Sequence, residues 1–273
     1  MKHFFAMIAI FVLCFSSNAF GQSKQFSLEE PVYDERLSGF SYPFKEKIFR
    51  FESQNKPLEM VYMYLPGRTD REVVTLFHGK NFNAAYWEDT ARLLVDNGYG
   101  VLMPDQIGFG KSSKPKDYQY SFSALAHNTR LLMASLNIEK AVIVGHSMGG
   151  MLATRFALDY PEATEKLILI NPIGLENYLN FVHYKDVGFF YRNELKKTPE
   201  KIKDYQQKNY YDGKWNERYD ALTIPLVGWV KGPDWKNIAF VNALTYDMIF
   251  VGMHLAPTTA IYCTCFKMEN RAT

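Results

Sequence analysis

Short apolar runs alternate with longer segments of helical periodicity through the first two thirds of the chain. Four apolar runs have the length of buried strands: "VVTLF" (73–77), "GVLMPD" (100–105), "KAVIVG" (140–145) and "KLILIN" (166–171). Helical segments separate them, at about 84–97, 121–136 and 148–160, with Ser121 as an N-cap and Pro161 ending the third. This order predicts a mostly parallel, doubly wound α/β sheet that is buried on both faces by helices.

Different patterns flank this core. Before it, "KIFRFES" and "LEMVYMYLPG" alternate apolar and polar residues around "QNKP", which indicates a β-hairpin. After Ile173 the strand pattern stops, and helical segments rich in aromatic residues continue to about Phe250. We interpret this region as a helical lid. Its aromatic side chains either line an apolar substrate pocket or pack the lid onto the core.

Composition and charge narrow the choice of function. The 273 residues are 47% hydrophobic, enough for one large domain, and 31 basic residues nearly balance 29 acidic ones. This balance gives no basis for a nucleic-acid partner or an anionic membrane surface. No stretch of the sequence reaches the roughly 18 apolar residues of a membrane span.

The first 21 residues have the pattern of a signal peptide. Lys2 precedes the apolar run "FFAMIAIFVLCF", and Ala19 and Gly21 supply small residues for cleavage. We therefore expect export to the periplasm or the medium, with no membrane attachment of the mature protein. Residues 22–262 contain no cysteine, and Cys263 and Cys265 alone make neither an easy disulfide nor a zinc site.

The stretch "VIVGHSMGGMLA" carries the strongest chemical signal. Gly145-His146-Ser147-Met148-Gly149 fits G-x-S-x-G between an apolar strand and a helix, the context of a nucleophile elbow. Such a turn exposes the Ser147 hydroxyl and needs glycine neighbours to avoid collisions. It also places the Met148 N–H at the helix N-terminus, where it can stabilise an oxyanion.

A second oxyanion donor is expected after an early strand. "FHGKN" ends the run 73–77, which makes the Lys80 N–H the preferred donor and Asn81 the alternative. We interpret His78 as a structural imidazole. Gly110-Lys111-Ser112 mimics the end of a phosphate-binding loop, but Asp105 stands where that motif requires glycine, so the loop is expected to be structural.

These motifs resemble a known family. "HGKNF", "PDQIGFGKS", "IVGHSMGGMLATRFALDYP" and "LILINPIGLE" are similar to the lid-bearing, serine-type branch of the α/β-hydrolase superfamily, over roughly residues 47–250. That branch includes esterases, proline iminopeptidases and carbon–carbon bond hydrolases, with epoxide hydrolases as relatives. The resemblance implies Ser147 as nucleophile and the Met148 and Lys80 amides as oxyanion donors. Serine at the elbow favours acyl transfer to water over epoxide opening.

The resemblance also implies an acid and then a histidine downstream of Ser147. Only His183, in the lid, and His254 follow Ser147, and the family's Gly-x-x-Asp strand end is missing. His254 lies about where a seventh strand would begin. Asn171 occupies an alternative acid position, and Glu176 follows five residues later. Glu176 and His254 are thus the candidate acid and base.

The expected organisation is a signal peptide (1–21), an N-terminal extension (22–46), the hydrolase core (47–172), the lid (173–250) and an atypical tail (251–273). Six strands can be counted instead of the family's eight, so the last strands are expected to be missing. The tail's composition suggests a frameshift or a truncated gene.

The resulting expectation is a serine hydrolase that cleaves an ester, amide or related acyl bond of a small apolar molecule, without metal or cofactor. The alternatives are a non-catalytic binding protein on the same fold and a cofactor-free haloperoxidase. An intact elbow disfavours the binding protein, because strained turns cost stability.

Overall fold

The computed structural model describes residues 31–68, 70–175, 178–180 and 182–252. The expected signal peptide, Glu176, His254 and nearly all of the expected tail lie outside these residues. The strands are β1 (Glu46–Ser53), β2 (Lys56–Leu65), β3 (Val73–Phe77), β4 (Gly100–Pro104), β5 (Ala141–His146) and β6 (Thr164–Ile170). The α-helices are α1 (Glu88–Asp96), α2 (Phe122–Ser135), α3 (Met148–Asp159), α4 (Val187–Glu194), α5 (Pro199–Tyr210), α6 (Asp220–Lys231) and α7 (Trp235–Gly252).

The strands form one sheet in the order β1-β2-β4-β3-β5-β6. β4, β3, β5 and β6 are parallel, while β2 runs antiparallel to β4 and to β1. The predicted mostly parallel α/β sheet is therefore confirmed. Among the described residues β6 pairs only with β5, so its outer edge has no strand partner.

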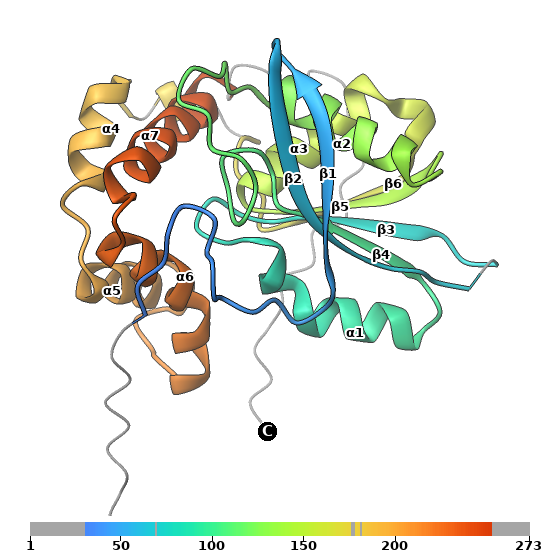
Figure 1. Cartoon of the computed structure of the whole chain (residues 1–273), viewed down its shortest axis with the longest axis horizontal. Helices are drawn as coiled ribbons and strands as arrows, with labels where there is room; N and C mark the ends of the chain where they lie inside the picture. Colours follow the sequence, from blue (N-terminus) through green and yellow to red (C-terminus); the bar gives the residue numbers. More distant parts are fainter. Residues whose placement is uncertain (1–30, 69, 176–177, 181, 253–273) are drawn as a thin grey trace, which may run out of the picture.

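Apolar residues fill both faces of the sheet, as the continuous apolar strands require. One cluster joins strand residues to α2, α3 and the second half of α7. The other joins them to α1 and the short 3₁₀ helix Ala84–Trp87 that precedes it. Figure 1 shows α1 on one face of the sheet and α2 with α3 on the other. Ser121 caps α2 by accepting a hydrogen bond from the Ala124 N–H, as predicted.

The hairpin turn differs slightly from the sequence-based expectation. Lys56 and Pro57 already belong to β2, and the turn consists of Gln54 and Asn55. Both turn residues have left-handed backbone angles, with φ of 54° and 57°. Two consecutive left-handed residues make the type I′ geometry that matches the twist of paired strands. The alternation predicted for the two strands is confirmed. The predicted turn also included Lys56 and Pro57, because proline is typical of turns, so the second strand begins earlier than expected.

Helices α4–α7 follow β6 and gather at one side of the sheet (Figure 1). α5, α6 and the first turns of α7 share an apolar cluster with the fully buried Leu37. The chain remains helical through Gly252, just before His254, as expected for the helical region that follows β6. The apolar residues of α7 pack onto α4 and the sheet cluster.

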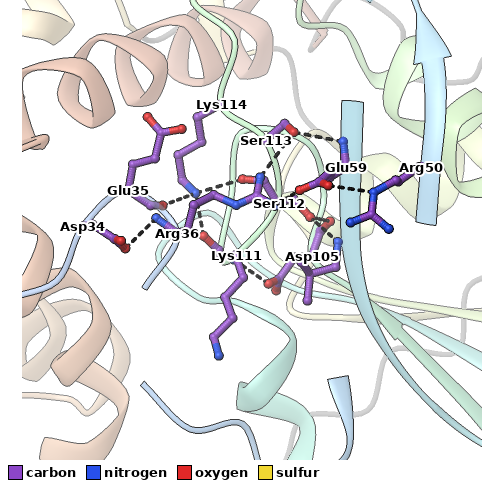
Figure 2. Close-up of polar contacts among 12 residues, drawn as sticks. Asp34, Glu35, Arg36, Arg50, Glu59, Asp105, Lys111, Ser112, Ser113 and Lys114 are labelled. Carbon is purple, nitrogen blue, oxygen red and sulfur yellow. Dashed lines mark hydrogen bonds and ion pairs between the residues drawn. The ribbon is translucent and has the colours of Figure 1, made fainter. Parts of the chain in front are cut away.

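The segment 31–45 before β1 joins the lid to the core. The Tyr33 N–H donates to the Gly228 carbonyl of α6, and the Trp229 indole N–H donates to the Asp34 carbonyl. On the core side, the Lys114 ammonium donates to the carbonyls of Glu35, Gly110 and Ser112 (Figure 2). Burial lowers the pKa of Lys114 to about 7. The segment therefore holds the lid against the loop that follows β4.

Candidate active site

Ser147 lies in a strained turn between β5 and α3. Its backbone angles are φ 57° and ψ −119°, a conformation that costs energy for any residue other than glycine. Three backbone hydrogen bonds hold the turn. The Ser147 N–H donates to the Ile170 carbonyl, and the Ser147 carbonyl accepts from Gly150 and Ile173. The structure thus places the serine at a sharp strand-to-helix corner, in the geometry that the motif predicts.

The positions around Ser147 require glycine because neighbouring atoms leave no room for a Cβ. A Cβ on Gly145 would lie 2.1 Å from the Gly149 carbonyl oxygen, and one on Gly149 would lie 2.2 Å from the Phe77 carbonyl oxygen. A Cβ on Gly150 would lie 2.6 Å from Cβ of Pro172. No side chain fits at these distances, so the motif is a steric requirement of this turn.

One predicted oxyanion donor directly follows the serine, and the other follows a loop residue that lies against it. Met148 is the first residue of α3, and Gly79-Lys80 follows β3. A Cβ on Gly79 would lie 3.3 Å from Cβ of Ser147, which places this loop directly against the serine. Within the described ranges, no backbone carbonyl or side chain accepts a hydrogen bond from the Met148 or Lys80 N–H. Both amides are therefore available to a ligand, and α3 adds the positive end of its dipole.

His78 is a structural residue, in agreement with its interpretation from the sequence. The ring is fully buried, its Nε2 accepts from the Gln106 N–H, and its Nδ1 lies 3.0 Å from the Gly79 carbonyl oxygen. The second contact requires a proton on Nδ1. Burial lowers the pKa of His78, which keeps the ring neutral. His78 thus ties the loop after β3 to the loop after β4.

His146 adjoins the serine in sequence but has the properties of a packing residue. Its ring stacks on Tyr86 at a centroid distance of 5.3 Å, and its buried Nδ1 has no partner among the described residues. Burial, with a smaller contribution from His78, lowers the pKa of His146 to about 4. Within the described residues this ring makes no hydrogen bond to the Ser147 hydroxyl, and such a weak base is poorly matched to proton abstraction near neutral pH.

Asp105 organises the loop after β4, as predicted. Its buried carboxylate accepts hydrogen bonds from the Tyr42 hydroxyl (2.6 Å), the Ala84 N–H (2.7 Å) and the Lys111 N–H (2.7 Å). Figure 2 shows this carboxylate among the polar residues of the loop and β2. Gly110 must be glycine, because its φ is 47° and a Cβ would lie 2.2 Å from the Asp105 carboxylate. The Gly-Lys-Ser sequence is therefore part of a structural turn.

The Lys80 side chain is a feature that the sequence did not indicate. Its ammonium is buried, donates to Oδ1 of Asn242 on α7, and lies 4.6 Å from the centre of the Tyr246 ring. Asn242 in turn donates to the buried Glu194 carboxylate, which also pairs with Lys197 at 2.7 Å. Burial lowers the pKa of Lys80 to about 7, although Glu194 partly offsets this effect. Lysine side chains are usually exposed to solvent, and this one is buried because the lid covers it.

Two cavities flank the loop that contains Lys80. The first, of about 390 Å³, lies between this loop (residues 80–88), residues 40–43 and α6. The second, of about 200 Å³, lies between the loop and the lid; its lining residues are Asn81, Lys197, Lys201, Ile202, Tyr205, Gln206, Leu226 and Tyr246. Ser147 lines neither cavity. The loop after β3 lies against Ser147 at Gly79, and Asn81 of the same loop borders both cavities.

The structure brings Ser147, Met148 and Lys80 together, but it places neither predicted partner of the serine. His183 lies exposed in the lid, and His254 and Glu176 lie outside the described residues. Asn171 is exposed at the end of β6 with φ 40°. Within the described residues, no side chain hydrogen-bonds the Ser147 hydroxyl, and no group of three or more histidine, cysteine or acidic residues could hold a metal ion. No described helix has the length and apolar character needed to cross a membrane.

Comparisons with known proteins agree with this geometry. The sequence profile of the alpha/beta hydrolase fold family matches residues 72–222, more than half of the chain. A crystal structure described as a "probable hydrolytic enzyme" from Pseudomonas aeruginosa PAO1 superimposes with a TM-score of 0.79 at 46% identity, covering 81% of this chain and 72% of that one.

Curated relatives match over shorter stretches. A 2-hydroxy-6-oxononadienedioate/2-hydroxy-6-oxononatrienedioate hydrolase from Comamonas testosteroni is 39% identical over 45% of this chain and 44% of its own. A 2-hydroxy-6-oxo-6-phenylhexa-2,4-dienoate hydrolase from Burkholderia cepacia is 37% identical over 44% of this chain and 43% of its own. The matched stretch thus spans less than half the length of these relatives. The profile match, the neighbouring structure and the serine turn lead to one conclusion: the chain belongs to the α/β-hydrolase fold family.

Proposed function

We propose that the protein is a serine hydrolase that cleaves an ester, amide or related acyl bond of a small, largely apolar molecule. The observation that carries this proposal is the positive φ of Ser147 at the junction of β5 and α3. A serine is held in this costly conformation by three backbone hydrogen bonds and by glycines that no larger residue can replace. Such strain is expected where it exposes a nucleophile.

The arrangement supports attack of the Ser147 hydroxyl oxygen on a carbonyl carbon. The new C–O bond forms as the carbonyl electron pair moves to oxygen, and the Met148 and Lys80 amides donate to that oxyanion. A base takes the hydroxyl proton, the oxyanion collapses, the bond between the carbonyl carbon and the leaving group breaks, and the base returns the proton to that group. Water then adds to the acyl carbon, and cleavage of the ester bond to Ser147 releases the acid and restores the hydroxyl. His254 as base and Glu176 as acid remain the sequence-based proposal for these steps. The relatives named as hydrolases of 2-hydroxy-6-oxo-dienoates add this compound class to the substrates to be tested.

A fluorophosphonate probe tests the nucleophile directly. We expect labelling of the wild type and of the control Ser135→Ala, whose hydroxyl only bonds the Leu132 carbonyl of its own helix. Ser147→Ala should not be labelled. If Ser147→Ala is labelled as strongly as the wild type, Ser147 is not the nucleophile.

The same assay examines the proposed base. Loss of a triad member leaves only the oxyanion and binding contributions, so His254→Ala should label at least about 10³-fold more slowly than the wild type. Equal rates would remove His254 from the mechanism. A folded wild type that is never labelled would favour a non-catalytic binding protein. That alternative is motivated by the absence, within the described residues, of any side chain bonded to the Ser147 hydroxyl.

We also propose export on the basis of residues 1–21. Detection of a mature chain that begins near Gln22 would support it, and a full-length chain in the cytoplasm would contradict it.

A further inference from the structure

The loop after β3, which presents the proposed second oxyanion donor, is bonded to the core at both of its ends. At one end, Nε2 of the buried His78 ring accepts a hydrogen bond from the Gln106 N–H (3.2 Å). At the other end, the Ala84 N–H donates to the buried Asp105 carboxylate (2.7 Å). Residues 80–83 lie between these two anchors, so the core does not by itself fix their position.

Lys80 and Asn81, in the middle of this loop, are bonded to the lid. The Lys80 ammonium donates to Oδ1 of Asn242 on α7 (3.1 Å), and Nδ2 of Asn81 donates to the Tyr210 hydroxyl at the end of α5 (3.2 Å). Among the described residues, these are the only hydrogen bonds that the two loop residues make. Two lid helices therefore hold the part of the loop that the core does not bond.

The two lid side chains are themselves held in place. Asn242 is buried, and its Nδ2 donates to the buried Glu194 carboxylate of α4 (3.1 Å). Because a carboxylate only accepts hydrogen bonds, the amide must turn its nitrogen to Glu194 and its oxygen to Lys80. The Tyr210 ring packs edge-on against Phe82 at a centroid distance of 5.6 Å. Both lid partners thus offer their acceptor atoms to the loop in a defined direction.

The bonded segment directly adjoins Ser147. A Cβ on Gly79 would lie 3.3 Å from Cβ of Ser147, and the next peptide unit carries the Lys80 N–H. Glycine restricts the orientation of that unit less than any other residue. An oxyanion donor must nevertheless lie within about 3 Å of the developing charge. The bonds that hold the side chains of Lys80 and Asn81 therefore limit how far this N–H can turn away.

We propose that Asn242 and Tyr210 are positioning residues of the lid, which orient the backbone N–H of Lys80 toward the oxyanion. This inference rests on the proposed function, because it concerns the second donor of the same site. The oxyanion site is then complete only while α5 and α7 lie against the loop after β3. The position of the lid thereby acts on the chemical step.

Reversible binding of a trifluoromethyl ketone measures oxyanion stabilisation. The Ser147 oxygen bonds to the ketone carbon, the carbonyl electron pair becomes an alkoxide on oxygen, and the hydroxyl proton passes to the base. Calorimetric titrations would compare 1,1,1-trifluorooctan-2-one with octan-2-one, which has the same chain but a less reactive carbonyl. We expect the wild type to bind the fluorinated ketone at least about 100-fold more tightly, and Ser147→Ala to lose this preference.

Two lid variants test the positioning. Tyr210→Phe removes one hydroxyl and keeps the ring, and Asn242→Leu removes the acceptor of the Lys80 ammonium. Each should lower the preference for the fluorinated ketone at least about tenfold, because a small misplacement of a catalytic group is costly. The controls Tyr211→Phe, whose ring stacks on Tyr219, and Asn237→Ala, exposed on α7, should keep the preference of the wild type.

A double variant tests whether Asn242 acts through Lys80. Lys80→Met keeps the backbone N–H and loses the same hydrogen bond, so its preference should fall as far as that of Asn242→Leu. Combining the two should lower it no further, because both remove one interaction. A preference that falls by the product of the two single effects would show that the residues act separately and would contradict the inference.

The titrations separate positioning from mere stabilisation of the fold. The stoichiometry counts folded sites, whereas the preference between the ketones describes each folded site. If Tyr210→Phe and Asn242→Leu lower the stoichiometry or the melting temperature but keep the preference, the inference is overturned while the serine hydrolase stands. If the wild type binds both ketones equally, Ser147 does not add to a carbonyl, and the proposed function fails together with the inference.

Discussion

Replacement of Lys80 by methionine should change how the stability of the protein depends on pH. The ammonium of Lys80 is buried between the loop after β3 and α7, with Asn242 as its hydrogen-bond partner. Glu194, Lys197, Tyr246 and His78 are the titratable groups around it. Glu194 favours the charged form of Lys80 and Lys197 opposes it, but burial dominates and lowers the pKa from 10.5 to about 7.

The sign and size of the effect follow from this pKa. Between pH 7 and 10.5 the unfolded chain holds a proton on Lys80 that the folded chain has lost, so folding becomes more favourable as pH rises. Each pH unit within this window contributes about 1.4 kcal/mol. From pH 7 to pH 10.5 this effect raises the free energy of unfolding by roughly 5 kcal/mol in total. Below pH 7 both the folded and the unfolded chain hold the proton, so the cost of burying the charge no longer changes with pH. The wild type should therefore gain stability relative to Lys80→Met across this window.

Urea unfolding of both proteins at pH 7.5, 8.5 and 9.5 measures this difference. We expect the free energy of unfolding of the wild type, minus that of Lys80→Met, to rise by about 1.4 kcal/mol per pH unit. The difference removes the contribution of Lys114, which titrates in both proteins. Lys208→Met, which removes an exposed lysine of α5, should give a curve parallel to the wild type. A parallel curve for Lys80→Met as well would refute the reasoning.

Three further substitutions test the packing. Asp105→Asn should lower the free energy of unfolding by about 3 kcal/mol in urea titrations, because three donors lose a carboxylate acceptor; a loss under about 1 kcal/mol would contradict that role. Gly149→Ala should cost about 3 kcal/mol, since its Cβ would meet the Phe77 carbonyl, and a melting temperature equal to the wild type's would disprove the clash. Leu37→Ala should cost about 3 kcal/mol and make the lid more sensitive to limited proteolysis, and unchanged cleavage would separate residues 31–45 from lid stability.

Local signals in the sequence predicted the elements of the core and the turn at Ser147. Apolar runs of strand length, the N-cap Ser121 and the glycines of G-x-S-x-G each act within a few residues, so a single sequence displays them. The position of the hairpin turn was predicted less well. Gln54 and Asn55 adopt left-handed angles that glycine usually supplies, and their sequence therefore gave a weak turn signal.

The helix α7 belongs to the region that the sequence predicted as helical to about Phe250, but its packing was not predicted. The helix continues through Gly252, and α4 and the sheet cluster cover its apolar side chains. Which neighbours are available to bury an apolar segment is decided by the whole fold.

The sequence by itself determined the α/β sheet, the strained serine and the loop that presents the Lys80 N–H, because each follows from steric and periodic rules over neighbouring residues. Only the tertiary structure decided that the Lys80 side chain is buried and that, within the described residues, the buried Gln206 amide has no hydrogen-bond partner. The burial of Lys80 arises where the lid meets the core, because its partner Asn242 lies 162 positions away in the sequence. Burial and electrostatic environment depend on such distant contacts, which local sequence does not encode.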